Sequence, residues 1–288
     1  MIRFPMSLFS SHSDFPIHLQ YGQHSADDCY MHGHEDYFEM VVVLEGRAEH
    51  LVGEDSYKIS AGDVFVINSS TEHGFKSADK IVICNIMFKP EILGQMFNIA
   101  ETEGFQALFI LEPQFTQNHR FSGGLRLPAE SFVQVRMLIE QMMEEYNRCG
   151  EGWQTLVYAD FLRLCVLLSS NYSAQPETDI MRLSRTKAYI EKHFCEEISN
   201  AVLADIAGYS ERQLIRLFRS AMDMTPKNYI NSLRIHKSRH LLRSTGLSVG
   251  EIAWQCGFND QNYFSRLFRR NAGMSPTDFR NKAAESRG

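Results

Sequence analysis

The 288-residue sequence lacks the features of several protein classes. Its six cysteines are scattered and none forms a Cys-x-x-Cys pair, which excludes a dense disulfide scaffold and indicates buried free thiols in a reducing compartment. No run approaches the ~18 apolar residues of a membrane-spanning helix. The N-terminus has Arg3 but no apolar segment of the kind found in a secretion signal. We therefore expect a cytoplasmic protein with no membrane partner.

The sequence also lacks an overall excess of positive charge, because 29 Lys and Arg face 35 Asp and Glu. Divided at the polar stretch around Pro176, however, residues 1–180 contain 11 basic and 25 acidic residues, a net charge of −14. Residues 181–288 contain 18 basic and 10 acidic residues, a net charge of +8. This asymmetry is typical of a protein whose second half binds nucleic acid.

The first third of the chain predicts a β-domain. Short runs rich in Val, Ile and aromatic residues, separated by Gly, Asp and Asn, occur at 39–44, 48–52, 56–59, 64–67 and 81–88. Short strands without intervening helices are typical of a sandwich or barrel. Residues 91–128 show a mixed pattern that predicts no single type of element.

From Pro128 the apolar residues recur at helical spacing. Two such runs, separated by Gly150 and Gly152, predict a helical hairpin with these apolar positions: Val135, Leu138, Ile139, Met142, Tyr146, then Leu156, Phe161, Leu164, Cys165 and Leu168. The hairpin could pack on the barrel or pair with the same stripe of a second subunit, and we expect both. Residues 173–180 are polar and predict a linker.

The basic half contains an internal repeat. Residues 203–209 align with 252–258 at an offset of 49, and residues 214–219 align with 264–269 at an offset of 50. Both copies have the parts of a helix-turn-helix motif. They share a small residue where two helices cross, a glycine expected at positive φ in the turn, and a residue that caps the second helix: Ala207 and Cys256, Gly208 and Gly257, Ser210 and Asp260.

A single helix is predicted between the two copies. Thr225-Pro226 starts this helix and Thr245-Gly246 ends it. Its length of about 19 residues at ~1.5 Å each gives ~28 Å, close to the ~34 Å turn of DNA, so the two motifs could enter successive major grooves. Ser248 and Glu251 form the capping-box pattern that opens the second copy.

The second helix of each copy carries polar residues on its outer face. Charged residues on a helix are often merely solvated, but Arg216 and Arg266 recur at the same place in both copies. We expect base contacts from the residues on the outer face: Arg212, Gln213, Arg216, Gln261, Asn262 and Arg266. We expect phosphate contacts from a second basic set: Arg219, Lys237, Arg239, Arg243, Arg269 and Arg270.

Residues 182–284 resemble the DNA-binding domain of the AraC/XylS family of bacterial transcription regulators. The resemblance includes the signature of the second copy: Ile252-Ala253, Cys256-Gly257-Phe258, Tyr263-Phe264-Ser265-Arg266-Leu267-Phe268-Arg269 and Gly273-Met274-Ser275-Pro276. It implies that residues 211–219 and 261–269 each read one major groove.

Eight of the eleven histidines lie in the acidic half. His32, His34 and Glu39, followed by Gly46, Gly62 and His73, resemble the two motifs of cupin barrels, which implies that the three histidines and the glutamate converge. Asn68 and Ser70 stand where the second motif has Pro and Gly, which leaves the placement of His73 open. Tyr37 and Arg47 are further candidates to line the barrel.

Three imidazoles and a carboxylate suit a divalent transition metal, so Zn, Ni, Fe or Mn is a candidate cofactor, though none is required. The alternative is that His32, His34, Glu39 and His73 form hydrogen bonds within the barrel or with a small effector, without metal. AraC-type regulators with a cupin sensor, the rhamnose regulators among them, resemble this arrangement, and there the pocket binds an effector.

We predict an α+β multidomain chain with a cupin-like effector-sensing barrel over 1–128, the hairpin for dimerisation over 129–172, the linker over 173–180 and an all-α double helix-turn-helix domain over 181–288. The predicted function is a non-enzymatic, sequence-specific DNA-binding regulator, an activator of carbohydrate-related genes. Its expected partners are double-stranded DNA, a small polar effector such as a sugar, a second copy of the chain and RNA polymerase. The alternative is a metal-dependent cupin sensor or enzyme joined to a DNA-binding domain.

Overall fold

The computed structural model describes residues 2–10, 12, 14–24, 30–53, 55–96, 99–117, 124–175 and 177–285. The chain divides into two compact units, Met1–Ser184 and Arg185–Gly288. The division falls inside helix α5 (Asp179–His193), a few residues beyond the linker expected at 173–180. Helix α4 ends at Ser173, so only a short connection separates the two helices, and Pro176 lies outside the described residues.

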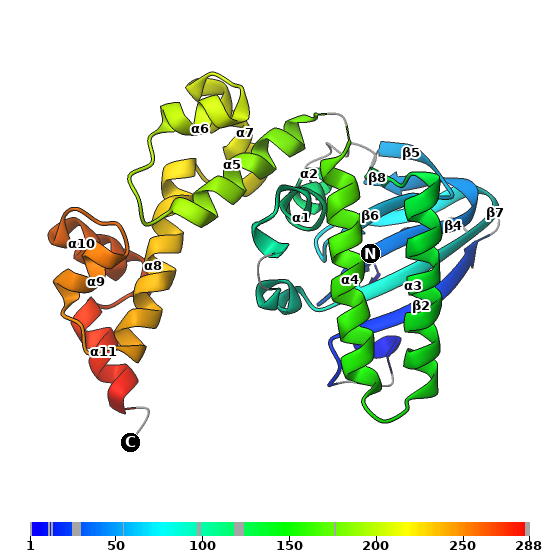
Figure 1. Ribbon diagram of the computed structural model, residues 1–288, viewed down its shortest axis with the longest axis horizontal. Helices are drawn as coiled ribbons and strands as arrows, with labels where there is room; N and C mark the ends of the chain where they lie inside the picture. Colours follow the sequence, from blue (N-terminus) through cyan, green and yellow to red (C-terminus); the bar gives the residue numbers. More distant parts are fainter. Residues whose placement is uncertain are drawn as a thin grey trace. The chain divides into compact units, whose positions relative to one another are not determined.

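The first unit is built on a six-stranded antiparallel sheet in the order β2-β7-β4-β6-β8, with β5 paired to β4 (Figure 1). Its strands are β2 (Ile17–His24), β4 (Phe38–Val52), β5 (Asp55–Ser60), β6 (Asp63–Ile67), β7 (His73–Phe88) and β8 (Leu125–Arg126). A second, parallel pair joins β1 (Arg3–Phe4) to β3 (Gly33–His34), and a 3₁₀ turn, η1 (Met6–Leu8), follows β1.

Strands β4 and β7 are longer than the sequence pattern predicted. The runs at 39–44 and 48–52 form one strand of 15 residues, because Gly46 makes an irregularity within the strand in place of a turn. Gly46 has φ +73°, and a Cβ there would lie 2.3 Å from the backbone oxygen of Lys80, so only glycine fits. Strand β2, which no apolar run predicted, pairs with β7 along its whole length.

The core of the first unit lies on the inner face of the sheet, where these residues cluster: Val41, Val43, Ile59, Phe65, Ile67, Phe75, Ile81 and Ile83. All residues from Glu39 to Leu44 are buried, so this part of β4 is covered on both faces. The expectation of a β-domain is therefore confirmed, although β4 and β7 are longer than the short strands expected, and helices cover its outer face (Figure 1).

The predicted helical hairpin forms as α3 (Ala129–Arg148) and α4 (Trp153–Ser173), with Cys149 and Gly152 in left-handed conformation at the turn. Figure 1 shows the two helices antiparallel beside the sheet. His18 Nδ1 of β2 lies 2.7 Å from the Tyr146 hydroxyl of α3, and the rings of Phe88 and Phe161 are 5.3 Å apart.

The apolar stripe named for the hairpin is therefore buried against its own sheet. The prediction that this stripe pairs with a second subunit is wrong, because all of its residues but Leu156 are buried within the same chain. The side chain of Leu156 is exposed. The physical reason is that an amphipathic surface helix turns its apolar face toward the nearest core, and the sheet supplies that core within the same chain.

The mixed segment forms short helical pieces: η2 (Pro90–Gln95), η3 (Ile99–Glu101), α1 (Glu103–Phe105), the π-helix η4 (Gln106–Leu111) and α2 (Glu112–Gln117). This segment packs on α4. A Cβ on Gly104 would lie 1.9 Å from the backbone oxygen of Ser169, and the Tyr172 hydroxyl donates to buried Glu112 at 2.5 Å.

The second unit is all helical. Its elements are the end of α5, then α6 (Asn200–Ala207), α7 (Glu211–Met222), α8 (Pro226–Ser244), α9 (Val249–Gln255), α10 (Gln261–Ala272) and α11 (Pro276–Glu285). Helices α6 and α7 form the first helix-turn-helix motif and α9 and α10 form the second, with α8 between them (Figure 1). The second motif packs around a core that includes Ala253, Cys256, Phe264 and Phe268.

The helix starts and turn glycines predicted for the second unit are confirmed. The side chains of Ser210 and Asp260 cap α7 and α10, Thr225 caps α8 with Pro226 at its first position, and Ser248 and Glu251 form the capping box of α9. Gly208 and Gly257 have φ of 66° and 85°, as the turns require.

The cysteines are less uniform than expected. Cys84, Cys165 and Cys256 are buried free thiols, whereas Cys195 is half-buried and Cys149 is exposed. The prediction of buried thiols is thus wrong for Cys149, which ends α3 at the exposed tip of the hairpin, and Cys29 lies outside the described residues. Within the described ranges, no helix has the length and apolar character needed to cross a membrane.

Candidate functional site

The two recognition helices, α7 and α10, present matched surfaces. The six candidates for base contact are all exposed: Arg212, Gln213 and Arg216 on α7, and Gln261, Asn262 and Arg266 on α10. On the opposite face, Leu214 and Phe264 are fully buried at equivalent positions. Because burial fixes the rotation of each helix, Arg216 and Arg266 point away from the core in both motifs.

The six candidates for phosphate contact fall into two groups. Arg219, Arg269 and Arg270 are exposed on the recognition helices. The other three have partners within the domain. Lys237 Nζ lies 3.2 Å from Cys195 Sγ, Arg239 donates to the Asn271 carbonyl at 2.7 Å, and Arg243 lies over the Phe279 ring. Phosphate contact by any of the six stays a prediction.

The second motif contacts the loop between α5 and α6, which leads into the first motif. Gly257, in the turn of the second motif, packs so closely on Cys195 of this loop that a Cβ would lie 2.3 Å from the Cys195 carbonyl oxygen. Arg234 of α8 donates to the carbonyls of Phe194 and Glu196 at 2.6 and 2.7 Å. These contacts tie α8 and the second motif to the loop between α5 and α6.

The candidate residues of the first unit form one cluster, in which His34, Glu39 and His73 are buried and His32 is half-buried. One ligand atom from each of His32, His34, Glu39 and His73 lies within 4.8 Å of the others. The Nε2 atoms of His34 and His73 are 3.2 Å apart, and Glu39 Oε2 lies 3.7 Å from the first and 3.3 Å from the second. The structure therefore brings together the four residues whose convergence the resemblance to cupin motifs implied, His73 included.

His73 reaches the cluster although its motif departs from the usual pattern. Asn68 Oδ1 accepts hydrogen bonds from the backbone N–H of Ser70 and the hydroxyl of Thr71, at 3.0 and 2.8 Å. This side-chain turn takes the role of the missing Pro and Gly. The backbone of His73 then exchanges two hydrogen bonds of 3.0 Å with His32, which fixes the two residues side by side.

Burial controls the charge of the cluster. It raises the pKa of Glu39 to about 8 and lowers the pKa of His34 to about 3, and it lowers the pKa of His73 well below its ordinary value. The neutral forms of all three groups are thus favoured in the protein alone. Glu39 Oε2 and His34 Nδ1 have no hydrogen-bond partner among the described residues, which is unusual for buried polar atoms.

One residue of the cluster was missed by the motif analysis. His50 of β4 is fully buried, and its Nε2 lies 3.3 Å from Nδ1 of His73. Its ring stacks on Phe65 at 4.3 Å, which holds it in place. Ala48, His50 and Val52 alternate with more exposed residues along the strand, and this alternation was the available signal.

The two minor candidates of this site differ in outcome. Tyr37 is buried and stacks on His34, with ring centroids 4.4 Å apart. Arg47 lies outside the cluster, because its exposed side chain pairs with Asp79 at 3.0 Å. The suggestion that Arg47 lines the barrel is wrong. A residue next to the irregularity at Gly46 changes the face on which its side chain lies.

A duplicated helix-turn-helix domain with matched basic recognition helices, carried by a chain with a cupin-like β-domain, defines a sequence-specific DNA-binding transcription regulator. Comparisons with known proteins agree. A family model described as a cupin domain matches residues 17–86, and one described as a helix-turn-helix domain matches residues 203–282.

Similar proteins cover most of the chain. The HTH-type transcriptional activator RhaS of Enterobacter sp. (strain 638) is 32% identical over 248 residues, which is 86% of each chain. RhaS of Salmonella arizonae is 33% identical over 255 residues, again 86% of each chain. A crystal structure of an AraC-type regulator from Chromobacterium violaceum is 31% identical and covers 36% of this chain and 92% of its own, with a TM-score of 0.34. The chain belongs to the AraC family of transcription regulators, with an N-terminal cupin domain.

Proposed function

We propose that this protein is a cytoplasmic transcription activator whose cupin domain binds a small polar effector, a sugar or sugar derivative, without catalysing a reaction. The observation that carries the DNA-binding part of this proposal is that Arg216 and Arg266 are exposed at matched positions on two helices whose opposite faces are buried in the core. The effector part is supported by the cluster of His32, His34, Glu39 and His73, whose imidazole and carboxylate groups form hydrogen bonds with hydroxyls. The relatives named activators support the sign of regulation.

We further propose that the cluster holds a divalent transition metal, Zn, Ni, Fe or Mn. Nitrogen and oxygen ligands lie at ~2.1 Å from such an ion, so any two of them would lie at most about 4.2 Å apart. The four ligand atoms, within 4.8 Å of one another, need only a small contraction. A cation would also satisfy Glu39 Oε2 and stabilise its ionised form against burial. A bound ion would act as a Lewis acid toward an oxygen of the effector.

Glu39→Gln tests the metal proposal, and a screen of sugars on the wild type tests the effector proposal. The variant keeps the size of the side chain and removes its charge. With metal added, the wild type is expected to gain thermal stability and the variant to gain much less. A screen of monosaccharides and sugar acids, with and without metal, should then show an effector that stabilises the wild type. If no metal raises the wild-type melting temperature, the metal proposal fails. If no sugar does, with or without metal, the effector proposal fails.

We propose that the hairpin still mediates a homodimer, through residues other than the stripe first considered. Val133 and Met137, one helical turn apart on α3, are 57% and 65% exposed. Met137→Glu should reduce the mass measured by light scattering to that of one chain, whereas Gln134→Glu, the same added charge on an exposed polar position, should not. A wild type with the mass of one chain would contradict the proposal, as would equal masses for the two variants.

Activation implies contact with RNA polymerase. The direct assay is transcription from a promoter adjacent to the binding site, with purified polymerase and the full-length protein. Effector is expected to raise the transcript level, and the gain should disappear when Arg216 and Arg266 are both replaced by Ala. An effector-dependent fall in the transcript would identify a repressor.

A further inference from the structure

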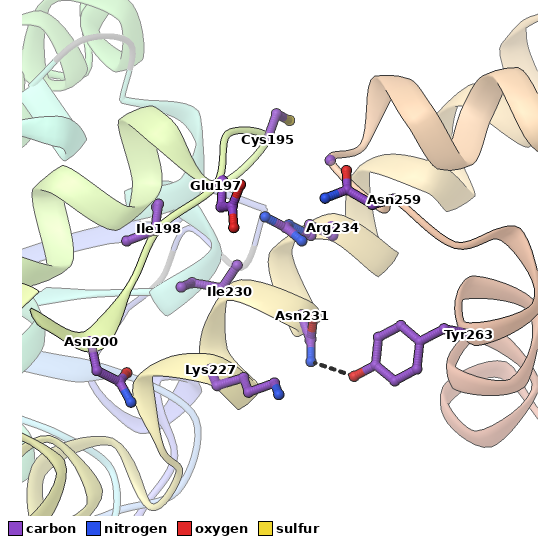
Figure 2. A pocket seen from close by; sticks show the side chains of 11 residues that line it. Cys195, Glu197, Ile198, Asn200, Lys227, Ile230, Asn231, Arg234, Asn259 and Tyr263 are labelled. Atoms are coloured by element: carbon purple, nitrogen blue, oxygen red, sulfur yellow. Dashed lines mark hydrogen bonds between the residues drawn. The ribbon is translucent and has the colours of Figure 1, made fainter. Parts of the chain in front are cut away.

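A groove of about 450 Å³ opens within the second unit, between the two helix-turn-helix motifs (Figure 2). Glu197 lines it from the loop before α6, Asn200 lines it from the first motif, and Asn259 and Tyr263 line it from the second. Its floor is one face of α8. None of the residues expected to contact bases lines this groove, so its polar lining has no assigned role.

The groove is preformed by hydrogen bonds. Lys227, Asn231 and Arg234 follow one another at helical spacing and share a face of α8. Asn231 Nδ2 donates to the Tyr263 hydroxyl at 3.2 Å, which joins α8 to α10. Arg234 is held by the carbonyls of Phe194 and Glu196 in the loop before α6, at 2.6 and 2.7 Å. The walls of the groove therefore need little rearrangement to receive a ligand.

The lining favours an anion. Lys227 and Arg234 bring two positive charges against the single negative charge of Glu197. Lys227 is exposed and has no ion-pair partner in the part of the chain that the structure describes. The side-chain amides of Asn200 and Asn259 add donors on both walls. Ammonium, guanidinium and amide donors together are the groups that bind phosphate oxygens.

The position of the groove in the domain indicates which phosphate groups it would bind. In helix-turn-helix proteins, the start of the recognition helix reaches the base edges and the first helix crosses the DNA backbone. The groove contains Asn200, at the start of the first helix α6, and Asn259 and Tyr263, at the start of the recognition helix α10. Both ends therefore contain positions that lie next to DNA in complexes of helix-turn-helix proteins. Two motifs in successive major grooves leave a minor groove and its flanking phosphates between them.

We propose that this groove binds the DNA phosphate backbone between the two half-sites, with Lys227 as its principal cation. The proposal rests on DNA binding by α7 and α10 and adds a contact that neither recognition helix makes. A groove contact would couple the two half-sites, because the intervening backbone has to pass Lys227 when both helices are engaged. The negative charge of Glu197, which lines the same groove, would oppose the approach of the phosphates.

Lys227→Gln in the full-length protein tests the proposal, with Lys282→Gln on α11 as the control that removes the same charge outside the groove. Affinity for a specific duplex is measured by fluorescence anisotropy over a series of salt concentrations. Lys227→Gln should weaken specific and random duplexes alike and reduce the slope of log K against log salt by about 1, and Lys282→Gln should leave the slope unchanged. Glu197→Gln should strengthen binding to both duplexes.

Ethylation interference locates the contact. In the wild type, ethylation of phosphates between the half-sites should block binding, and Lys227→Gln should remove that interference while leaving the interference within the half-sites. Equal salt slopes for Lys227→Gln and Lys282→Gln, with interference unchanged, would overturn the groove proposal alone. A wild type that binds all duplexes equally would overturn the specific DNA-reading function, and the groove proposal with it.

Discussion

The contact between Gly257 and Cys195 holds the second motif against the loop that leads into the first motif, and Gly257→Ala perturbs this contact with a single carbon atom. The new Cβ would lie 2.3 Å from the carbonyl oxygen of Cys195 and 2.7 Å from its carbonyl carbon. Because both separations are below 3.0 Å, the backbone of one of the two residues would have to move. Restoring 3.0 Å requires Gly257 and the backbone of Cys195 to separate by at least 0.7 Å, the difference between the two distances. We expect this shift to move the second motif relative to the first and to weaken the simultaneous binding of two half-sites.

The energetic cost has two parts. The alanine would adopt the left-handed conformation at φ +85°, which costs ~1–2 kcal/mol. Overlap with the backbone of a packed neighbour adds about 1–3 kcal/mol. Gly273→Ala is the matched control, because Gly273 has φ +74° and no atom within 4 Å of a new Cβ. Gly273→Ala therefore has the cost of the left-handed backbone conformation without the cost of overlap with a neighbour.

Urea denaturation and DNA binding of the two variants measure the difference. Gly257→Ala should be less stable than Gly273→Ala by about 1–3 kcal/mol. It should also lose affinity for a duplex with two half-sites while retaining the weaker binding to one half-site, whereas Gly273→Ala should bind both duplexes as the wild type does. Equal stability and equal two-site affinity in the two variants would refute the role of this contact.

Three further predictions concern stability. Ser248→Ala removes the capping box of α9 and should lower the free energy of unfolding by ~1 kcal/mol in urea titrations; no change would contradict the importance of the cap. Phe264→Ala empties a fully buried position of the second motif and should cost ~3–5 kcal/mol, with DNA binding lost as that motif unfolds; a cost below ~1 kcal/mol would show that the core closes around the gap. Burial lowers the pKa of His18 below 6.5, so the unfolded chain takes up a proton first as the pH falls, and stability from this residue is present above pH 6.5 and lost below it. His18→Gln should therefore flatten the decline in melting temperature between pH 7 and pH 5, and parallel declines would contradict this assignment.

Local signals made the helical unit predictable. Caps and turn glycines act within a few residues, so Ser210, Gly208 and the Ser248–Glu251 pair were read correctly from the chain alone. Gly46 shows the opposite case. A glycine inside a strand marks either a turn or an irregularity, and only the approach of Lys80 from β7 decides between them.

The candidate sites divide in the same way. The cluster of His34, Glu39 and His73 followed from the resemblance to the cupin motifs, because strand alternation alone relates only His32 to His34 and the other two residues lie on separate strands. The Asn68 turn that replaces the usual Pro and Gly could not be read from spacing. The groove at Lys227 depends on contacts between segments more than 30 residues apart, such as Asn231 with Tyr263, and no periodicity encodes them.

The measurement that tests the central claim most directly is a base-by-base binding profile of the full-length protein and its Arg216→Ala and Arg266→Ala variants. A two-motif reader predicts that each variant loses ~1–3 kcal/mol of discrimination at one base position, and that the two positions lie about one turn of DNA apart, in different half-sites. Uniform weakening across all positions in both variants would contradict direct base reading by α7 and α10, as would two affected positions in the same half-site.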